Sequence, residues 1–197
     1  MVNDDLHLAA DLEDGSCVTG QQRLTGKEVA PLKSPVSRLF LSSHPDRPVP
    51  AKAEIRKKNR RLIQQAELIC YPPGSFYTSL VANLLPTGVG SAIAGADCPK
   101  VFIPNLGQDP EQIGMTLDSS VQTLLDYLRA DNKDTCPNGK LLNFVLIDSK
   151  RGKYPSSLSD PLMQELGIRI IDTRLISKQS EPYYDAELLA STLLSLT

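Results

Sequence analysis

The residues best suited to bind a ligand lie between Cys70 and Ser79, where an apolar segment ends in two prolines, a glycine and three hydroxyl side chains. Gly74 permits a close approach between backbone and ligand, and a helix predicted to begin at or just after Ser75 presents N–H groups without partners inside the helix. Such groups lie at the positive end of the helix dipole and favour an anion such as phosphate or diphosphate. Ser75, Thr78 and Ser79 add hydroxyls to the same turn. We therefore predict a phosphate-binding turn; the alternative is a proline-stiffened turn in which Ser75 only caps the helix.

Polar side chains also follow three other apolar segments. Asn105 comes after residues 101–103 and is placed either to hydrogen-bond a base, sugar or phosphate, or to stabilise its own turn. Asp148 and Asp172 follow two later apolar segments, where a carboxylate holds Mg²⁺ or a ribose hydroxyl, or serves as a loop residue or helix cap. Asp148 is the weak candidate for a metal ligand.

These side chains need strands and helices to bring them together, and the sequence pattern supplies both. Residues 6–19 read as a β-hairpin that turns at Asp14–Gly15, and residues 36–41 read as a further strand. From residue 51 onward, short apolar strands alternate with helices, which favours a parallel sheet with helices on its faces. The predicted strands are 68–71, 101–103, 142–147 and 168–171, and the predicted helices are 51–66, 78–95 with a break near Pro86, 117–128, 160–166 and 186–194.

We expect one α/β domain over residues 1–197, with a hairpin and connection over 1–50 and βα repeats over 51–197. In such a sheet, ligands bind beyond the carboxyl ends of the strands, which is where all of these polar residues fall.

The amino-acid composition limits the classes of protein to which this chain can belong. The chain has 21 basic and 23 acidic residues, a formal net charge of −2, and 41% hydrophobic residues. This balance is typical of a globular protein and argues against a nucleic-acid binder. Neither an export signal nor a membrane-spanning run appears, and the four cysteines form no CxxC pair, so we expect a cytoplasmic protein with reduced thiols and no membrane partner.

Two further motifs are given structural interpretations. Residues 56–61 hold five cations in six positions, and we interpret them as the solvated face of an amphipathic helix. Gly88-Val89-Gly90 lacks the third glycine of a dinucleotide-binding fingerprint, because Ile93 stands there, and no strand precedes it.

Three ordered segments resemble the CofD-like family. Residues 66–79, AELICYPPGSFYTS, are similar to that family's segment ADLIVxGPGSLYTS. Residues 6–15, LHLAADLEDG, resemble its hairpin, and residues 100–106, KVFIPNL, resemble the strand that follows. The likeness runs in register to about Leu128 and covers the middle and C-terminal part of the family.

The resemblance implies a Rossmann-like three-layer fold with a nucleoside-diphosphate-linked small molecule along the strand ends. One branch of the family transfers a phospholactyl group from a guanosine diphosphate conjugate to a deazaflavin acceptor with Mg²⁺. The other branch, the gluconeogenesis factors, is regarded as non-catalytic and binds nucleotide-sugars. Carried over by position, Gly74, Ser75, Thr78 and Ser79 match the ligand loop, and Asn105 matches the asparagine after the next strand. We expect the 2-phospho-L-lactate transferase type, with the regulator as the alternative.

The sequence departs from the family in three respects, one of which is that Pro73 gives PPG where the family usually has GPG. Family members usually carry a glycine-rich strand–loop–helix unit ahead of the hairpin, and this sequence shows none. We therefore expect an N-terminally truncated member, whose partner is a separately encoded N-terminal half or a second copy, and whose catalysis needs the missing half. Ser119–Ser120 stands where regulator-type members commonly carry Asp–His. The Mg²⁺ expectation comes from the resemblance and not from a local motif.

Overall fold

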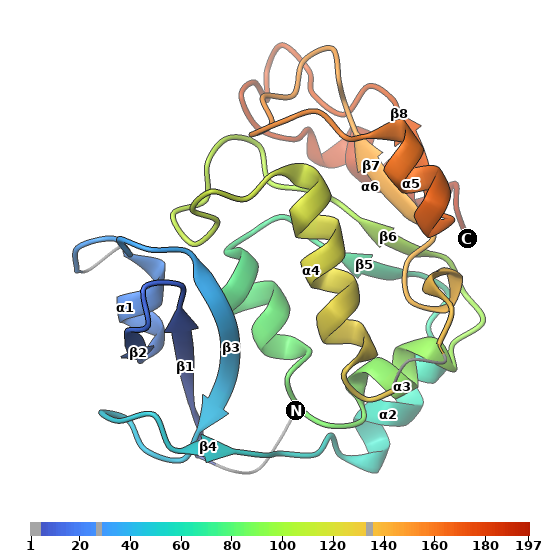
Figure 1. Ribbon diagram of the computed structural model, residues 1–197. Helices are drawn as coiled ribbons and strands as arrows, with labels where there is room; N and C mark the ends of the chain where they lie inside the picture. The colour runs from blue at the N-terminus through green and yellow to red at the C-terminus, as the bar shows by residue number, and fades with distance from the viewer. Residues whose placement is uncertain (1–4, 27–28, 133–135) are drawn as a thin grey trace.

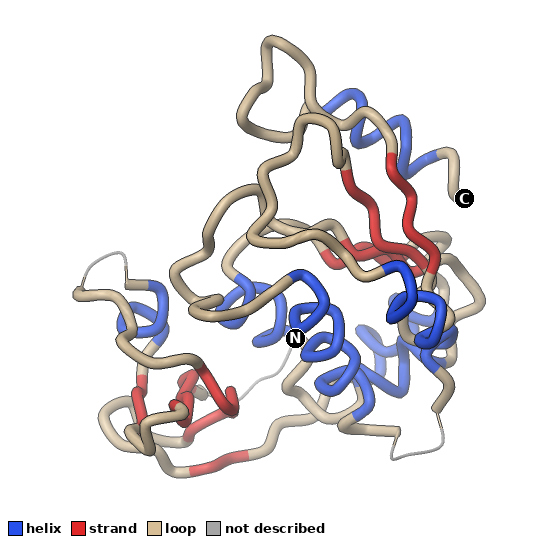
Figure 2. The backbone as a smooth tube through the Cα atoms, turned by 45° about the horizontal axis from the view of Figure 1, so that its top comes forward, coloured by secondary structure: helices blue, strands red, loops and turns tan. Residues whose placement is uncertain are grey.

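The strands of this protein form two separate sheets, as Figures 1 and 2 show. The computed structural model describes residues 5–26, 29–132 and 136–197. The first sheet is antiparallel with the order β2-β1-β3-β4, and the second is parallel with the order β5-β6-β7-β8. The strands are β1 His7–Leu12, β2 Cys17–Thr19, β3 Val36–Ser42, β4 Pro50–Ala51, β5 Ile69–Tyr71, β6 Lys100–Phe102, β7 Phe144–Ile147 and β8 Arg169–Asp172.

Helices separate the two sheets and cover both faces of the parallel one. The α-helices are α1 Gln21–Thr25, α2 Lys57–Gln64, α3 Val89–Ala94, α4 Leu117–Arg129, α5 Asp160–Leu166 and α6 Ala186–Leu194. A π-helical segment η1 (Phe76–Leu80) continues into a 3₁₀ turn η2 (Val81–Asn83), and a second 3₁₀ turn η4 spans Asn138–Lys140. None of the helices in the described ranges is both long and apolar enough to cross a membrane.

The Asp14 side chain stabilises the predicted hairpin turn at Asp14–Gly15. The Asp14 carboxylate accepts hydrogen bonds from the Ser16 backbone N–H at 2.9 Å and from the Ser16 hydroxyl at 2.6 Å. These two hydrogen bonds hold the pKa of Asp14 below its usual value, and the bond from the Ser16 hydroxyl makes the largest contribution. The predicted hairpin and the strand that begins at Val36 are both confirmed.

Strand β6 shows how the layers are built, because its successive side chains point to opposite faces. Phe102 belongs to the large core that includes Leu124 of α4, whereas Val101 and Ile103 belong to a smaller core against α6. The large core also contains Leu39 of β3, so it joins the two sheets through the helices between them. Figure 1 shows α4 in front of the parallel sheet and α6 behind it.

Two predicted helices differ from those in the structure. The helix predicted over 51–66 is limited to Lys57–Gln64, because Pro50–Ala51 pairs with β3 and Glu54 makes a bridge to Thr87. The helix predicted over 78–95 is divided into η1, η2 and α3. Gly88, with φ 96°, begins the third piece, which agrees with the predicted break near Pro86.

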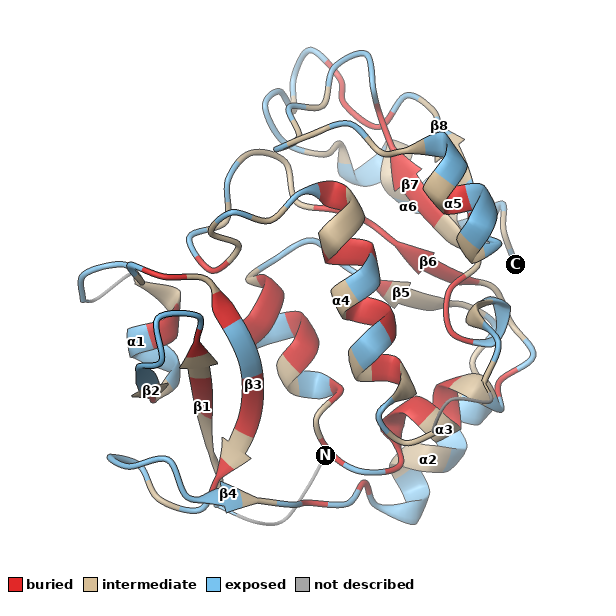
Figure 3. Ribbon diagram, in the orientation of Figure 1, coloured by how far each residue is buried: buried red, intermediate tan, exposed pale blue. Residues whose placement is uncertain are grey.

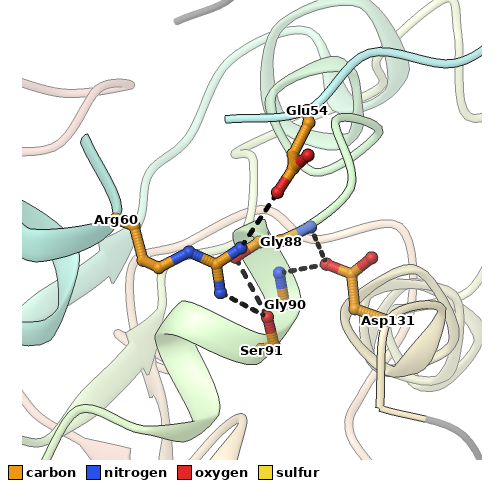
Figure 4. A network of polar contacts seen from close by, with 6 residues as sticks. All are labelled: Glu54, Arg60, Gly88, Gly90, Ser91 and Asp131. Carbon is orange, nitrogen blue, oxygen red and sulfur yellow. Dashed lines mark hydrogen bonds and ion pairs between the residues drawn. The ribbon is translucent and has the colours of Figure 1, made fainter. Parts of the chain in front are cut away.

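The Gly88-Val89-Gly90 segment is the place where α3 meets α4. Both glycine N–H groups donate to the carboxylate of Asp131, at 2.7 Å from Gly88 and 3.0 Å from Gly90. Figure 4 shows this carboxylate at the start of α3. A Cβ on Gly90 would collide with the carbonyl oxygen of Leu128 on α4. The segment therefore packs two helices together and leaves no free amides for a dinucleotide.

Because Gly90 lies so close to the Leu128 carbonyl oxygen, adding one methyl group at Gly90 should destabilise the protein. We expect Gly90→Ala to lower the free energy of unfolding by about 2 kcal/mol, because the two helices must move apart. The matched control is Gly139→Ala, since no heavy atom lies within 4 Å of a Cβ placed there. Urea unfolding measures both, and equal midpoints for the two variants would contradict the close packing of α3 on α4.

Candidate functional site

The turn after β5 is held by two carboxylates from a distant loop. The Phe76 backbone N–H donates to the Asp109 carboxylate at 2.7 Å. The Tyr77 and Thr78 N–H groups both donate to one oxygen of Glu111 at 2.8 Å, and the Thr78 hydroxyl donates to the other oxygen at 2.6 Å. The first amides of η1 therefore all carry a partner supplied by this chain.

The amides of Phe76, Tyr77 and Thr78 lack partners inside the helix, as expected, but Asp109 and Glu111 occupy them, so they are not open to a ligand phosphate. Glu111 is only 1% exposed, and its charge is compensated by two backbone N–H groups and one hydroxyl rather than by a cation. The positive potential at the start of a helix explains why a carboxylate is stable there. The turn thus has the geometry of an anion site, and in this structure the anions are side chains of the protein itself.

Asn105 fixes the glycine that precedes this turn. Its side-chain amide accepts from the Gly74 N–H at 2.7 Å and donates to the Gly74 carbonyl at 2.7 Å. Gly74 has φ 148°, a conformation that residues with a Cβ rarely adopt. The same Asn105 nitrogen lies 3.2 Å from both Asp109 and Gln112. The structure therefore brings Asn105 to the predicted turn, where its hydrogen-bonding groups are used within the protein.

The network continues into α4 through Gln112 and Ser120, neither of which was predicted to bind a ligand. Gln112 donates to the Ser120 hydroxyl at 2.8 Å, and that hydroxyl donates to the Thr116 carbonyl at 2.9 Å. Ser120 is 1% exposed, and its buried hydroxyl accepts from Gln112 and donates to the Thr116 carbonyl. Asp109, Glu111 and Gln112 occupy one loop after β6 and face a turn more than thirty positions earlier, a pairing that single-sequence periodicity does not reveal.

Tyr77 connects the turn to the antiparallel sheet. Its backbone N–H binds Glu111, and its hydroxyl lies 3.3 Å from the Val36 carbonyl oxygen of β3. Burial raises the pKa of Tyr77, with smaller contributions from nearby groups including Tyr127, Glu13 and Glu111. The phenol therefore remains a neutral hydrogen-bond donor at physiological pH.

Two predicted ligand residues remain open to a ligand. The hydroxyls of Ser75 and Ser79 have no hydrogen-bond partner among the residues that the structure describes, and Ser79 is exposed. Both residues line a hollow of about 240 Å³ that also includes Gly74, Asn83 and the side of β5. Thr78 is buried and engaged with Glu111, so it supports this wall without facing the hollow.

Asp148 organises the loops beyond the carboxyl ends of β7 and β8. One of its oxygens accepts from the Leu175 and Ile176 N–H groups at 3.0 and 3.1 Å, and the other accepts from the Arg151 N–H at 3.1 Å. It is 2% exposed. Asp172 accepts from the backbone and hydroxyl of Ser149. Neither carboxylate is brought to the turn after β5.

The donor set does not fit a magnesium ion. Across residues 5–26, 29–132 and 136–197, no group of three or more His, Cys, Asp or Glu residues could hold a metal. Mg²⁺ prefers an octahedral set of oxygen ligands, and the best-placed carboxylates, Asp109 and Glu111, each already accept three N–H or O–H donors. We therefore assign no step to Mg²⁺ in the described part of this chain.

A family model described as "2-phospho-L-lactate transferase CofD" matches residues 1–181. This chain belongs to the CofD family. The predicted resemblance is confirmed.

Several relatives with curated names are gluconeogenesis factors. Those from Listeria monocytogenes and Bacillus subtilis are 33% and 26% identical over 97% and 96% of this chain. The relative from Halalkalibacterium halodurans is 26% identical over 91% of this chain and 53% of its own length. The match covers 53% to 57% of the length of these three relatives.

A solved structure shares the fold. It is a member of the UPF0052 family from Bacillus halodurans, with a TM-score of 0.74 and 22% sequence identity over 98% of this chain and 60% of that chain. The α/β, Rossmann-like fold with a parallel sheet is as predicted, and it adds a complete antiparallel sheet where a hairpin excursion was expected.

The buried carboxylate at the turn yields a stability prediction. Glu111→Ala leaves the Tyr77 and Thr78 amides and the Thr78 hydroxyl without their partner, and we expect the free energy of unfolding to fall by about 3 kcal/mol. Glu111→Gln keeps one acceptor oxygen and should lose less. The exposed Glu67 is the control, and Glu67→Ala should stay within about 0.5 kcal/mol of the parent. Equal losses for Glu111→Ala and Glu67→Ala in chemical denaturation would contradict this role.

Proposed function

We propose that this chain binds a nucleoside-diphosphate-linked small molecule at the carboxyl end of β5, as a regulator of the gluconeogenesis-factor type. The observation that carries the proposal is the pair of hydroxyls on Ser75 and Ser79, which face the hollow of about 240 Å³ without a partner among the described residues. Hydroxyl groups donate well to phosphate oxygens, and strand ends of this kind of sheet are where such ligands bind.

The rigidity of the turn supports the same proposal. Asp109 and Glu111 hold three successive amides, and Asn105 holds Gly74, so the two serines are mounted on backbone whose position is set before any ligand arrives. Preorganised groups lose less entropy on binding. In this proposal the ligand phosphate meets the serine hydroxyls, while the internal carboxylates continue to hold the turn.

Binding without turnover is the form of the proposal that this site supports best. Thr78, Asn105 and Asp148 all have their hydrogen-bonding groups committed to the protein, and no cluster of donors for a metal is found among the described residues. The similarity to proteins named gluconeogenesis factors agrees with a regulatory role.

Calorimetry with uridine and guanosine diphosphate sugars tests the ligand class. We expect the parent chain to bind saturably. The single variants Ser75→Ala and Ser79→Ala should each bind about tenfold more weakly, because each removes one hydrogen bond to a charged acceptor. Ser195→Ala, at the end of α6, should bind as the parent does. Absence of binding, or equal affinity in all four proteins, would overturn the proposal.

The description of the matching family model supports a second candidate, phospholactyl transfer from a guanosine diphosphate conjugate to a deazaflavin acceptor. The two candidates share the nucleotide and differ in turnover. Incubating the chain with that donor, the acceptor and Mg²⁺ should release no GMP if the chain acts as a regulator. Stoichiometric or catalytic GMP release that is lost in Ser75→Ala would favour the transferase instead.

A further inference from the structure

The amino edge of the parallel sheet carries a second cavity. Lys100, Phe144 and Arg169 are the first residues of β6, β7 and β8, so they lie at the same edge of the sheet. The cavity there has a volume of about 600 Å³ and is lined by residues from three segments, 96–100, 137–144 and 167–169. It shares no lining residue with the hollow of the proposed nucleotide site, so the two cavities are separate.

Asn143 fixes the floor of this amino-edge cavity. Its backbone N–H donates to the Lys100 carbonyl and its side-chain oxygen accepts from the Lys100 N–H, both at 2.9 Å. Its carbonyl accepts from the Arg169 N–H at 3.0 Å, and its side-chain amide donates to the Gly139 carbonyl at 2.7 Å. The three strand starts are therefore held in place before a ligand arrives, which lowers the entropy cost of binding.

The charge of the cavity is positive. Its charged lining residues are three cations and one carboxylate: Lys100, Lys140, Arg169 and Asp97. Lys140 lies 3.3 Å from Asp97, but the Asp97 side chain is 90% exposed, and such ion pairs are weak. Arg169 stacks over the Phe144 ring at 4.7 Å and forms no ion pair with any described residue. The stack orients the guanidinium plane, whose N–H groups donate well to an anion.

Lys100 adds a buried ammonium group at this edge. The residue is 2% exposed, and Figure 3 shows that β6 is buried along its whole length. Its ammonium donates to the Ala96 carbonyl at 2.5 Å and has no carboxylate partner within the described ranges. Burial lowers the pKa of Lys100, and the neighbouring Lys140 lowers it further, against smaller opposing effects of Cys98 and Asp97. A negative charge bound nearby offsets both unfavourable effects.

A structural alternative is that these cations only neutralise the C-terminal ends of α3 and α5, which reach the same edge. This alternative accounts for Lys100, because its ammonium binds the Ala96 carbonyl just beyond α3. It does not account for Lys140 and Arg169, since neither side chain donates to a helix carbonyl in the described part of the chain. Two cations therefore remain for a ligand.

We propose that the amino-edge cavity binds the phosphate group of a small phosphomonoester. A phosphate dianion matches the excess of two positive charges among the lining residues, and arginine with lysine is a favourable donor set for phosphate. The volume of the cavity suits a ligand of metabolite size. The inference does not rest on nucleotide binding, because it uses the opposite edge of the sheet.

Cys98 supplies a reporter within the cavity. It lines the cavity and is partly exposed, whereas Cys17 is exposed in the hairpin of the other sheet. The complete chain is alkylated with iodoacetamide at constant ionic strength, and each cysteine is followed by mass spectrometry. We expect glucose 6-phosphate to slow alkylation of Cys98 several-fold and to leave Cys17 unchanged. Inorganic phosphate should protect Cys98 only at higher concentration, and uncharged glucose should not protect it.

Substitutions of the two remaining cations locate the phosphate. In calorimetry, Arg169→Gln and Lys140→Gln should each bind glucose 6-phosphate about tenfold more weakly, because each removes a charged donor. Arg169→Lys keeps the charge and loses the planar guanidinium, so it should recover only part of the affinity. Two controls should bind as the parent does: Lys178→Gln, an exposed cation in another loop, and Ser75→Ala in the proposed nucleotide site.

Three outcomes overturn the proposal. The first is that neither phosphate compound protects Cys98. The second is that Arg169→Gln and Lys140→Gln bind glucose 6-phosphate as tightly as the parent, because the cations would then serve only the stability of the fold. The third is that inorganic phosphate or malonate protects Cys98 at a lower concentration than glucose 6-phosphate does, because the cavity would then select a free anion or a carboxylate.

Discussion

The carboxylate of Glu111 is the group on which the turn after β5 depends. It lies almost fully buried and receives two backbone N–H groups and a hydroxyl, so its charge is neutralised by dipoles rather than by a basic residue. Because Asp109 takes the preceding amide and Asn105 takes Gly74, the loop after β6 and the turn after β5 are a single hydrogen-bonded unit. Each segment supplies hydrogen-bond partners to the other.

In this chain the protein's own carboxylates occupy the first amides of η1. Helix-start amides are usually regarded as sites waiting for phosphate, yet here they are satisfied from within. What remains for a ligand is the hydroxyl surface that the amides support. In the proposed site, the buried carboxylates supply the rigidity and the hydroxyls of Ser75 and Ser79 would supply the recognition.

Much of the fold could be predicted from the sequence because local chemistry decides it. Asp14–Gly15 forms the hairpin, Thr116 and Ser119 cap α4 reciprocally, and Ser159 caps α5, so these elements begin where the sequence indicates. The errors arise where distant segments intervene. Pro50–Ala51 is drawn into β4 by β3, and the predicted 51–66 helix loses its first turns. The site shows the same limit: Gly74 and Ser75 are visible as a turn, but Glu111 becomes its partner only when β6 lies beside β5.

Tyr77 has a further consequence, because one residue belongs to both the turn and the antiparallel sheet. Its amide is tied to the loop after β6 and its phenol to β3, with a ring that meets Phe76 edge-on at 5.1 Å between centroids. The chain contains six tyrosines and no tryptophan. Tyrosine emission from this protein is therefore free of energy transfer to indole, and a change around Tyr77 would contribute to that emission together with the other five tyrosines.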